Sequence, residues 1–268
     1  MPPTLPPPPV EQWPIPRFVL QVGDLSHEGA KLFFASVQPH DALHEAVLST
    51  FTILYTPKTV PRKMQEIKLI LRPMSGVAHT CGSDTHREIH FALEWIKTNA
   101  HRAKDEIMGV LTHEVVHCFQ HDAKGTCPGG LIEGIADFVR LHSSLSPPHW
   151  HRAAPTDNQK WDAGYEKTAY FLDWINTRYG PKTIHALNLA FQDRKYHRRI
   201  FRDLTGRPLR KLWALYRESF STGGSPRQIF TPDPPAKSES EDEGYDRIDP
   251  DATTEQEPSQ QTSFDEQR

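Results

Sequence analysis

One short motif has the residue types and the spacing of a metal-dependent hydrolase. His113, Glu114 and His117 form an H-E-x-x-H pattern inside a run whose apolar periodicity predicts a helix over residues 103–121. Histidines four positions apart share a helix face, so both imidazoles reach one metal ion. The glutamate beside the first histidine then lies next to the water that the metal activates. The motif predicts two zinc ligands, His113 and His117, and a general base, Glu114.

A second helix, predicted over residues 131–142, supplies further candidate ligands. Its apolar residues share one face, and Glu133 and Asp137 lie on the other. Two such carboxylates are normally a solvated surface, but beside an H-E-x-x-H helix Glu133 is the expected third ligand of a tetrahedral zinc. Asp137, one turn later, is expected to accept the free ring N–H of a ligand histidine. The small residues Gly134 and Ala136 are expected to let this helix approach the first.

Tyr165 is the candidate for stabilising an oxyanion. It follows Gly164 at the start of a helix predicted over residues 164–179, where its hydroxyl would enter the cleft. The alternative is that Tyr165 packs with the other aromatic residues of this region. His149 and His151 are competing donors in a proline-rich loop, although each is expected first as a surface histidine. Tyr165 and these two histidines therefore all stay open as donors.

The elements that must position these groups change in type along the chain. Period-two alternation predicts strands over residues 67–71 and 88–95, and a further strand is expected over 17–25. After residue 100 every strong pattern is helical. Strands first and helices later predict an α+β fold with a mainly helical C-terminal part. The expected helices cover residues 27–36, 41–55, 103–121, 131–142, 164–179, 181–193 and 208–220.

The strand expected over residues 88–95 lies directly before the motif helix. Ile89, Phe91, Leu93 and Trp95 alternate along one face of it. If this is the edge strand of the cleft, an extended substrate would pair with its main chain, which reads backbone more than side chains. The competing interpretation is an interior strand with both edges already paired. The two interpretations predict different places for the substrate.

The chain of 268 residues divides into three regions of unlike composition. Residues 1–16 are rich in proline and predict a polyproline II arm of the kind that docks on SH3 or WW domains, or a stiff disordered leader. Residues 17–220 form the expected catalytic domain. Residues 221–268 are rich in Ser, Pro, Asp and Glu and predict an acidic disordered tail. The overall net charge of −3 therefore averages a mildly basic body and an acidic tail.

Composition also excludes several classes of protein. No apolar stretch is long enough to span a bilayer, and the body has no dense Lys/Arg run of the kind that binds nucleic acid. The three cysteines form no Cys-x-x-Cys pair, and Cys118 points away from the neighbouring histidine, so it is not an expected ligand. Residues 1–10 lack the basic start and the apolar run of a signal peptide. We therefore expect a cytoplasmic protein.

Three stretches together resemble a known family, the plant basic secretory protein peptidases, which have relatives in fungi and bacteria. They are residues 113–120, 128–140 (with Gly-Leu-Ile-Glu-Gly-Ile-Ala-Asp) and 161–174, within a likeness that runs from about residue 17 to 220. The resemblance implies a zincin-like metallopeptidase fold. It also implies a zinc endopeptidase acting on polypeptides, with Glu133 as the zinc ligand of Glu-zincins. Neither secretion nor a basic charge is carried over.

Two other functions fit the same motif. A zinc-binding interaction module would use the fold without turnover, but it has no need for a general base at Glu114. A zinc hydrolase of non-peptide amides would use the same residues on another substrate. Zinc is the expected cofactor in all three interpretations.

Overall fold

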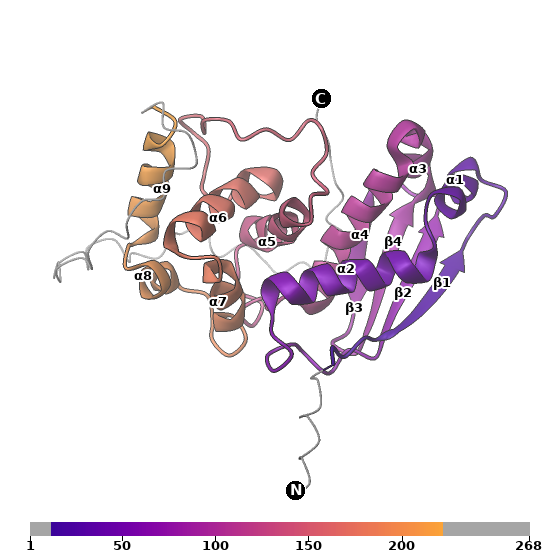
Figure 1. The fold of residues 1–268 in the computed structure, drawn as a ribbon, viewed down its shortest axis with the longest axis horizontal. Helices are drawn as coiled ribbons and strands as arrows, with labels where there is room; N and C mark the ends of the chain where they lie inside the picture. Colours follow the sequence, from indigo (N-terminus) through magenta and orange to yellow (C-terminus); the bar gives the residue numbers. More distant parts are fainter. Residues whose placement is uncertain (1–11, 222–268) are drawn as a thin grey trace, which may run out of the picture.

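The computed structural model describes residues 12–221. The predicted acidic tail, apart from residue 221, and most of the predicted proline-rich arm lie outside this range. Figure 1 shows two regions side by side, with a sheet and helices α1–α4 in one and helices α5–α9 in the other. The α+β class predicted from the sequence is confirmed, with a mainly helical C-terminal part.

Four strands form one mixed sheet. They are β1 (Arg17–Val22), β2 (Glu66–Arg72), β3 (Ala78–Gly82) and β4 (His86–Ala92), in the spatial order β1-β2-β4-β3. β1, β2 and β4 are parallel, whereas β3 runs antiparallel to β4. Alternate residues of the central strands are fully buried and form one apolar face of the sheet: Ile67, Leu69, Leu71, Ile89 and Phe91.

The prediction of an edge strand directly before the motif helix is wrong. β4 pairs with β2 on one side and with β3 on the other, so it is an interior strand. It ends at Ala92, and helix α3 (Leu93–Thr98) replaces the last residues of the expected strand. Leu93 and Ile96, three positions apart, are the buried residues there, which is a helical spacing. An extended substrate therefore has no free edge of β4 to pair with, and the nearby edge strand is β3.

The N-terminal helices surround the motif helix. α1 (Glu28–Ser36) and α2 (Pro39–Leu54) precede β2, and η1 (Ala100–Arg102) leads into α4 (Ala103–Phe119). α4 packs against α2, β3 and the C-terminal helix α5. Fourteen of its 17 residues are buried, so it is enclosed on all sides instead of having one polar face in solvent. The polar side chains of α4 must therefore find partners within the protein.

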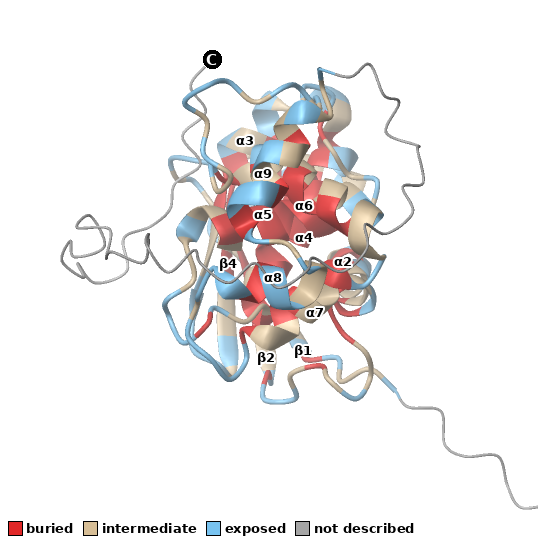
Figure 2. Cartoon of the chain, turned by 90° about the vertical axis from the view of Figure 1, so that its left-hand side faces the viewer, coloured by how far each residue is buried: buried red, intermediate tan, exposed pale blue. Residues whose placement is uncertain are grey.

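The C-terminal region is a cluster of five helices among the described residues. Four match predicted helices in type and approximate position, and α8 has no counterpart in the sequence analysis. They are α5 (Gly129–His142), α6 (Tyr165–Tyr179), α7 (Thr183–Ala190), α8 (Arg199–Thr205) and α9 (Leu209–Glu218). Figure 2 shows that the buried residues concentrate in α4, α5 and α6. The two regions are therefore joined by a common core.

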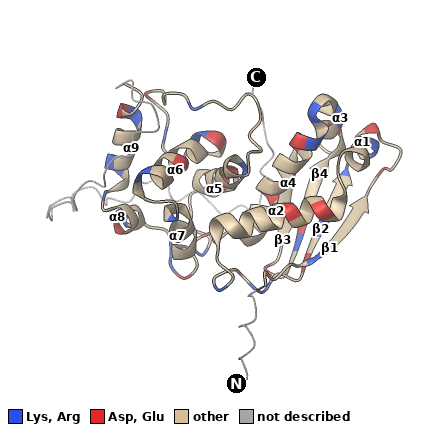
Figure 3. Ribbon diagram, viewed as in Figure 1, with Lys and Arg blue, Asp and Glu red and all other residues tan. Residues whose placement is uncertain are grey.

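Surface features agree with a compact body. Trp13, from the end of the predicted arm, packs on Phe51 of α2 with ring centroids 5.4 Å apart. Lys/Arg and Asp/Glu residues occur together on α3, α6 and α9 (Figure 3). No helix among the described residues is both long enough and apolar enough to cross a membrane.

Candidate metal centre

Two helices bring the predicted metal ligands together. α4 carries His113 and His117, and α5 carries Glu133 on the side that faces them. The ligand atoms of all three residues lie within 4.8 Å of one another. His113 is 2% exposed, but the side chains of His117 and Glu133 are 18% and 16% exposed. The group is therefore buried on one side and reachable by solvent on the other.

The three ligand atoms form a compact triangle. His113 Nε2 lies 3.1 Å from His117 Nε2 and 3.1 Å from Glu133 Oε2, and His117 Nε2 lies 3.6 Å from that same oxygen. Zinc bonds of about 2.0–2.1 Å in a tetrahedron set neighbouring ligand atoms about 3.3–3.4 Å apart. The triangle therefore has the size that a tetrahedral zinc requires. Two imidazole nitrogens and one carboxylate oxygen are also a donor set typical of catalytic zinc.

Asp137 orients the first histidine from behind, at the position expected from the sequence. The second ring nitrogen, His113 Nδ1, donates to Asp137 Oδ1 across 2.6 Å, and Asp137 is fully buried one turn along α5 from Glu133. A proton held on Nδ1 leaves the Nε2 lone pair directed at the triangle. Asp137 therefore fixes both the tautomer and the ring orientation that metal binding needs.

The charges of the centre are strongly coupled without a metal. Burial alone would lower the pKa of His113, but the Asp137 and Glu133 carboxylates outweigh it and raise the pKa to about 10. Burial alone would raise the pKa of Glu133, but hydrogen bonds from His113 and His117 hold it well below its ordinary range. Glu133 is therefore ionised at neutral pH, and the metal-free centre holds a proton in the place of a cation.

Glu114 has a partner that sequence reasoning missed. Thr80 of β3 donates its hydroxyl to the Glu114 carboxylate, at 2.7 Å from Oε2, and also lies 3.0 Å from the Glu114 carbonyl oxygen. Glu114 is 2% exposed, so this contact restricts a buried side chain. β3 has only five residues, too few for its alternation to stand out from a loop. The antiparallel pairing of β3 with β4 is what places Thr80 against α4.

Tyr165 lies beside the centre, at the first residue of α6. Its ring is nearly parallel to that of His113, with an interplanar angle of 17° and centroids 6.2 Å apart. Gly164 precedes it with φ of +91°, a conformation that glycine adopts without strain, and Tyr165 itself has φ of +46°. Burial and the nearby carboxylates raise the pKa of Tyr165 to about 12. Its hydroxyl therefore keeps its proton at neutral pH and remains a donor.

The other candidate residues differ from Tyr165 in burial or in the groups that they contact. His149 and His151 are exposed. Cys118 is buried on α4, and its thiol contacts the Glu114 carbonyl oxygen at 3.7 Å, away from the ligand triangle. All three cysteines are free thiols: Cys81, Cys118 and Cys127. The aromatic residues near Tyr165 also pack the C-terminal helices, for example Trp161 against Phe201 with centroids 5.6 Å apart.

Small residues make room where the helices pack, but Gly134 faces a different helix from the one that the sequence predicted. A Cβ atom on Gly134 would lie 2.2 Å from Thr168 Cγ2, so this glycine of α5 makes room for α6 and not for α4. Gly109 of α4 makes room for a side chain of α5, because a Cβ on it would lie 2.6 Å from Arg140 Nε. Arg140 Nη2 also lies 3.7 Å from Glu106 of α4, in a buried ion pair. This pair helps to hold together the two helices that carry the ligands.

Comparison with known proteins gives one match. A family model described as BSP, peptidase of plants and bacteria, matches residues 15–216, which is well over half of the chain. The match includes both ligand-bearing helices and Tyr165. No curated protein and no solved structure matches the chain.

Proposed function

The chain belongs to the BSP family, the peptidases of plants and bacteria, and from this premise we propose that it is a zinc-dependent endopeptidase of zincin type with His113, His117 and Glu133 as metal ligands. Peptidase activity follows from the family. The metal, the roles of the residues and cleavage within the chain are our proposal. The observation that carries it is the ligand triangle, whose edges of 3.1 to 3.6 Å fit a tetrahedral zinc.

Three features of the site support zinc as the resident metal. Its donors are two imidazole nitrogens and one carboxylate oxygen, which suit zinc, whereas calcium and magnesium prefer sites made of oxygen ligands alone. Asp137 supplies the outer hydrogen bond that ligand histidines usually have. With three protein ligands, a bound zinc ion would keep a fourth position for water or substrate. When bound, zinc polarises a carbonyl oxygen and makes water a nucleophile near neutral pH.

Each remaining residue then has a distinct task. Glu114 takes the proton from the attacking water and returns it to the leaving amine. Thr80 donates a 2.7 Å hydrogen bond to the Glu114 carboxylate. This bond restricts the Glu114 side chain to fewer rotamers, so the general base is held in position. Tyr165, which stays protonated, donates its hydroxyl to the oxyanion that forms at the scissile carbonyl.

The test is cleavage of denatured casein by Glu114→Gln and by wild type. Glutamine keeps the size of the side chain but cannot accept a proton, so the variant should bind zinc as wild type does. Its turnover should fall by about 10²–10⁴-fold, the usual contribution of a general base. A chelator should abolish wild-type cleavage, and added zinc should restore it. Wild-type turnover in Glu114→Gln would refute the mechanism.

The same experiment separates the two other functions. A zinc-binding module would bind zinc without cleaving casein or any peptide. A hydrolase of non-peptide amides would leave casein intact and hydrolyse small amides in a chelator-sensitive way. Either outcome would leave the ligand triangle in place and overturn the peptidase assignment.

A further inference from the structure

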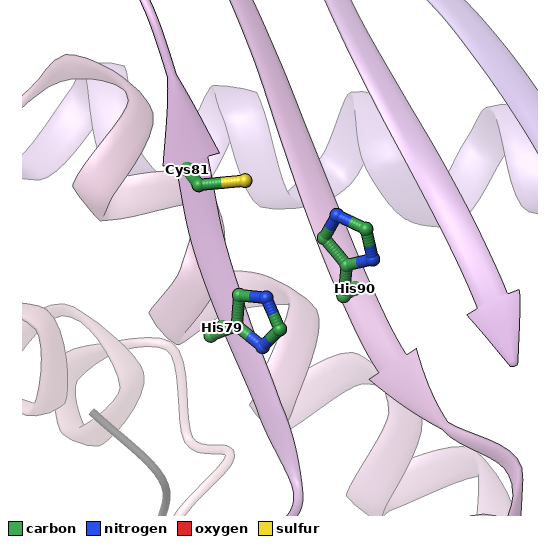
Figure 4. A group of neighbouring side chains, drawn as sticks. All are labelled: His79, Cys81 and His90. Carbon is green, nitrogen blue, oxygen red and sulfur yellow. The ribbon is translucent and has the colours of Figure 1, made fainter. Parts of the chain in front are cut away.

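The sheet presents a second group of metal-binding side chains, away from the ligand triangle. His79 and Cys81 of β3 and His90 of β4 project from the same face (Figure 4). Thr80, between the first two, projects from the opposite face, where it contacts Glu114 of α4. Because side chains alternate along a strand, the three residues lie on the face that turns away from α4. The two groups are therefore on opposite sides of the sheet.

Strand register brings the three side chains together. His79 is directly opposite His90 in the antiparallel pair, and Cys81 follows two positions later on the same face. The two imidazole rings are nearly parallel, with an interplanar angle of 10° and centroids 4.7 Å apart. One nitrogen of each histidine and the sulfur of Cys81 lie within 4.8 Å of one another. A tetrahedral site needs about 3.3–3.6 Å between such atoms, so the side chains must close by no more than about 1.5 Å.

Three charged side chains, Arg72, Lys68 and Glu88, surround this donor set. Arg72 Nε donates to His90 Nδ1 at 2.9 Å, so a neutral His90 ring carries its proton on Nε2. For His90 Nε2 to bind the ion, this proton must move to Nδ1 and Arg72 must turn away from the ring. Glu88, opposite Cys81, places its Oε2 3.4 Å from His90 Nε2, while its Oε1 pairs with Lys68 at 2.6 Å. The Glu88 carboxylate therefore offsets one of the two positive charges of Arg72 and Lys68 and offers a fourth ligand atom.

We propose that His79, Cys81 and His90 form a second metal site, for a thiophilic divalent cation of the zinc class. Thiolate and imidazole together favour zinc and disfavour calcium and magnesium, which prefer oxygen ligands. As the metal–sulfur bond forms, the Cys81 thiol gives its proton to solvent, and Glu88 or a water molecule takes the fourth position. Cys81 is exposed, so an ion can reach the site from solvent.

The site has a structural consequence for β3. This short edge strand pairs only with β4 among the described strands. An ion held by two residues of β3 and one of β4 would link the strands through side chains as well as through main-chain hydrogen bonds. On its other face the same strand carries Thr80, so the link would also fix the partner of Glu114. The proposal does not depend on peptidase activity, since it concerns residues outside the ligand triangle.

Cobalt(II) distinguishes the two sites, because only the second contains sulfur. We would titrate the metal-free, reduced full-length chain with Co²⁺ and follow the near-ultraviolet charge-transfer absorption of a cobalt–thiolate bond. Wild type should take up two ions per chain and show this absorption, and added Zn²⁺ should remove it. Cys81→Ser should take up one ion and lack the absorption. The change is small and lies on the surface, and circular dichroism would verify the fold.

Two further variants complete the test. Cys127→Ser removes another free thiol, and it should keep the absorption and both ions. His79→Ala should weaken or abolish the absorption while Cys81 remains, which identifies a site and not an isolated thiol. Absence of the absorption in wild type, its survival in Cys81→Ser, or its loss in Cys127→Ser alone would overturn the proposal. Because the measurement uses no peptide substrate, failure of the peptidase assignment would leave this result unaffected.

Discussion

Replacing Asp137 by asparagine should weaken metal binding without removing a ligand. Asp137 is not one of the proposed ligands, and it acts on the site only through His113, whose Nδ1 donates to its carboxylate at 2.6 Å. Asparagine has the same size, so the packing of the fully buried site is kept, but its neutral amide no longer supports the imidazole electrostatically. His113 becomes a weaker ligand, and its ring is less firmly oriented.

The magnitude follows from the kind of contact. Loss of such an outer hydrogen bond typically costs about 10- to 100-fold in metal affinity. At about 1.36 kcal/mol for each factor of ten, this is roughly 1.4–2.7 kcal/mol. The Asp137 contact is short and fully buried, so water does not screen it, and we expect the upper part of this range.

The same charge predicts how affinity depends on pH. In the metal-free protein the pKa of His113 is raised to about 10, so below that pH a metal must displace a proton from this histidine. Wild-type affinity should therefore rise by about tenfold per pH unit between pH 7 and 9. In Asp137→Asn the pKa of His113 falls, the proton competes less, and this slope should flatten. Below the wild-type pKa the competing proton weakens zinc binding more in wild type than in Asp137→Asn, so the full loss of affinity should appear only near and above pH 10.

The assay is competition for zinc with a chromophoric chelator, in a Cys81→Ser background so that the proposed second site does not contribute. Asp173→Asn is the matched control, because Asp173 also pairs with a histidine, His142, at 3.0 Å, outside the ligand triangle. That control should bind zinc with unchanged affinity. If Asp137→Asn matches it in affinity and in pH slope, Asp137 does not orient a ligand and the reasoning is wrong.

Three further changes test other parts of the site. Thr80→Val should lower kcat for casein about tenfold at unchanged zinc affinity, because the charged Glu114 carboxylate loses the hydrogen bond from the Thr80 hydroxyl. Thr80→Ser keeps a hydroxyl and should have the wild-type kcat. Tyr165→Phe should lower kcat by up to about 10²-fold with little change in KM. Because the pKa of Tyr165 is about 12, its hydroxyl stays protonated up to pH 10, and its ionisation should not affect wild-type activity in that range. Gly134→Ala should reduce the free energy of unfolding by about 1–3 kcal/mol in denaturant titrations, since its Cβ would lie 2.2 Å from a threonine methyl group of α6. The control is Gly129→Ala, whose Cβ would meet nothing within 4 Å, so its stability should be nearly that of wild type.

Local patterns were sufficient for the helices and for part of the site. The expected ranges 103–121 and 131–142 differ by two residues at one end from α4 (Ala103–Phe119) and α5 (Gly129–His142). The relation of His113 to His117 could be predicted because helix geometry alone places residues i and i+4 on one face. The spacing of Glu133 and Asp137 on α5 could be predicted for the same reason.

Only the tertiary structure decided which elements face one another. Whether Glu133 lies beside the histidines depends on how α5 packs on α4, and the spacing within either helix does not contain that information. The alternation through residue 95 suggested a continuing strand, but residues 93–98 form helix α3, in which Leu93 and Ile96 are buried. Pairing with both β2 and β3 makes β4 an interior strand.

β3 shows most clearly what the sequence alone could not predict. Five residues carry too little periodicity to identify a strand, yet antiparallel pairing with β4 sends Thr80 to Glu114 on one face and sets His79 and Cys81 beside His90 on the other. These contacts join residues that are distant in the chain, through main-chain hydrogen bonds that do not depend on side-chain type. Residue spacing therefore determined the groups that each helix presents, whereas strand pairing and helix packing determined which of those groups meet.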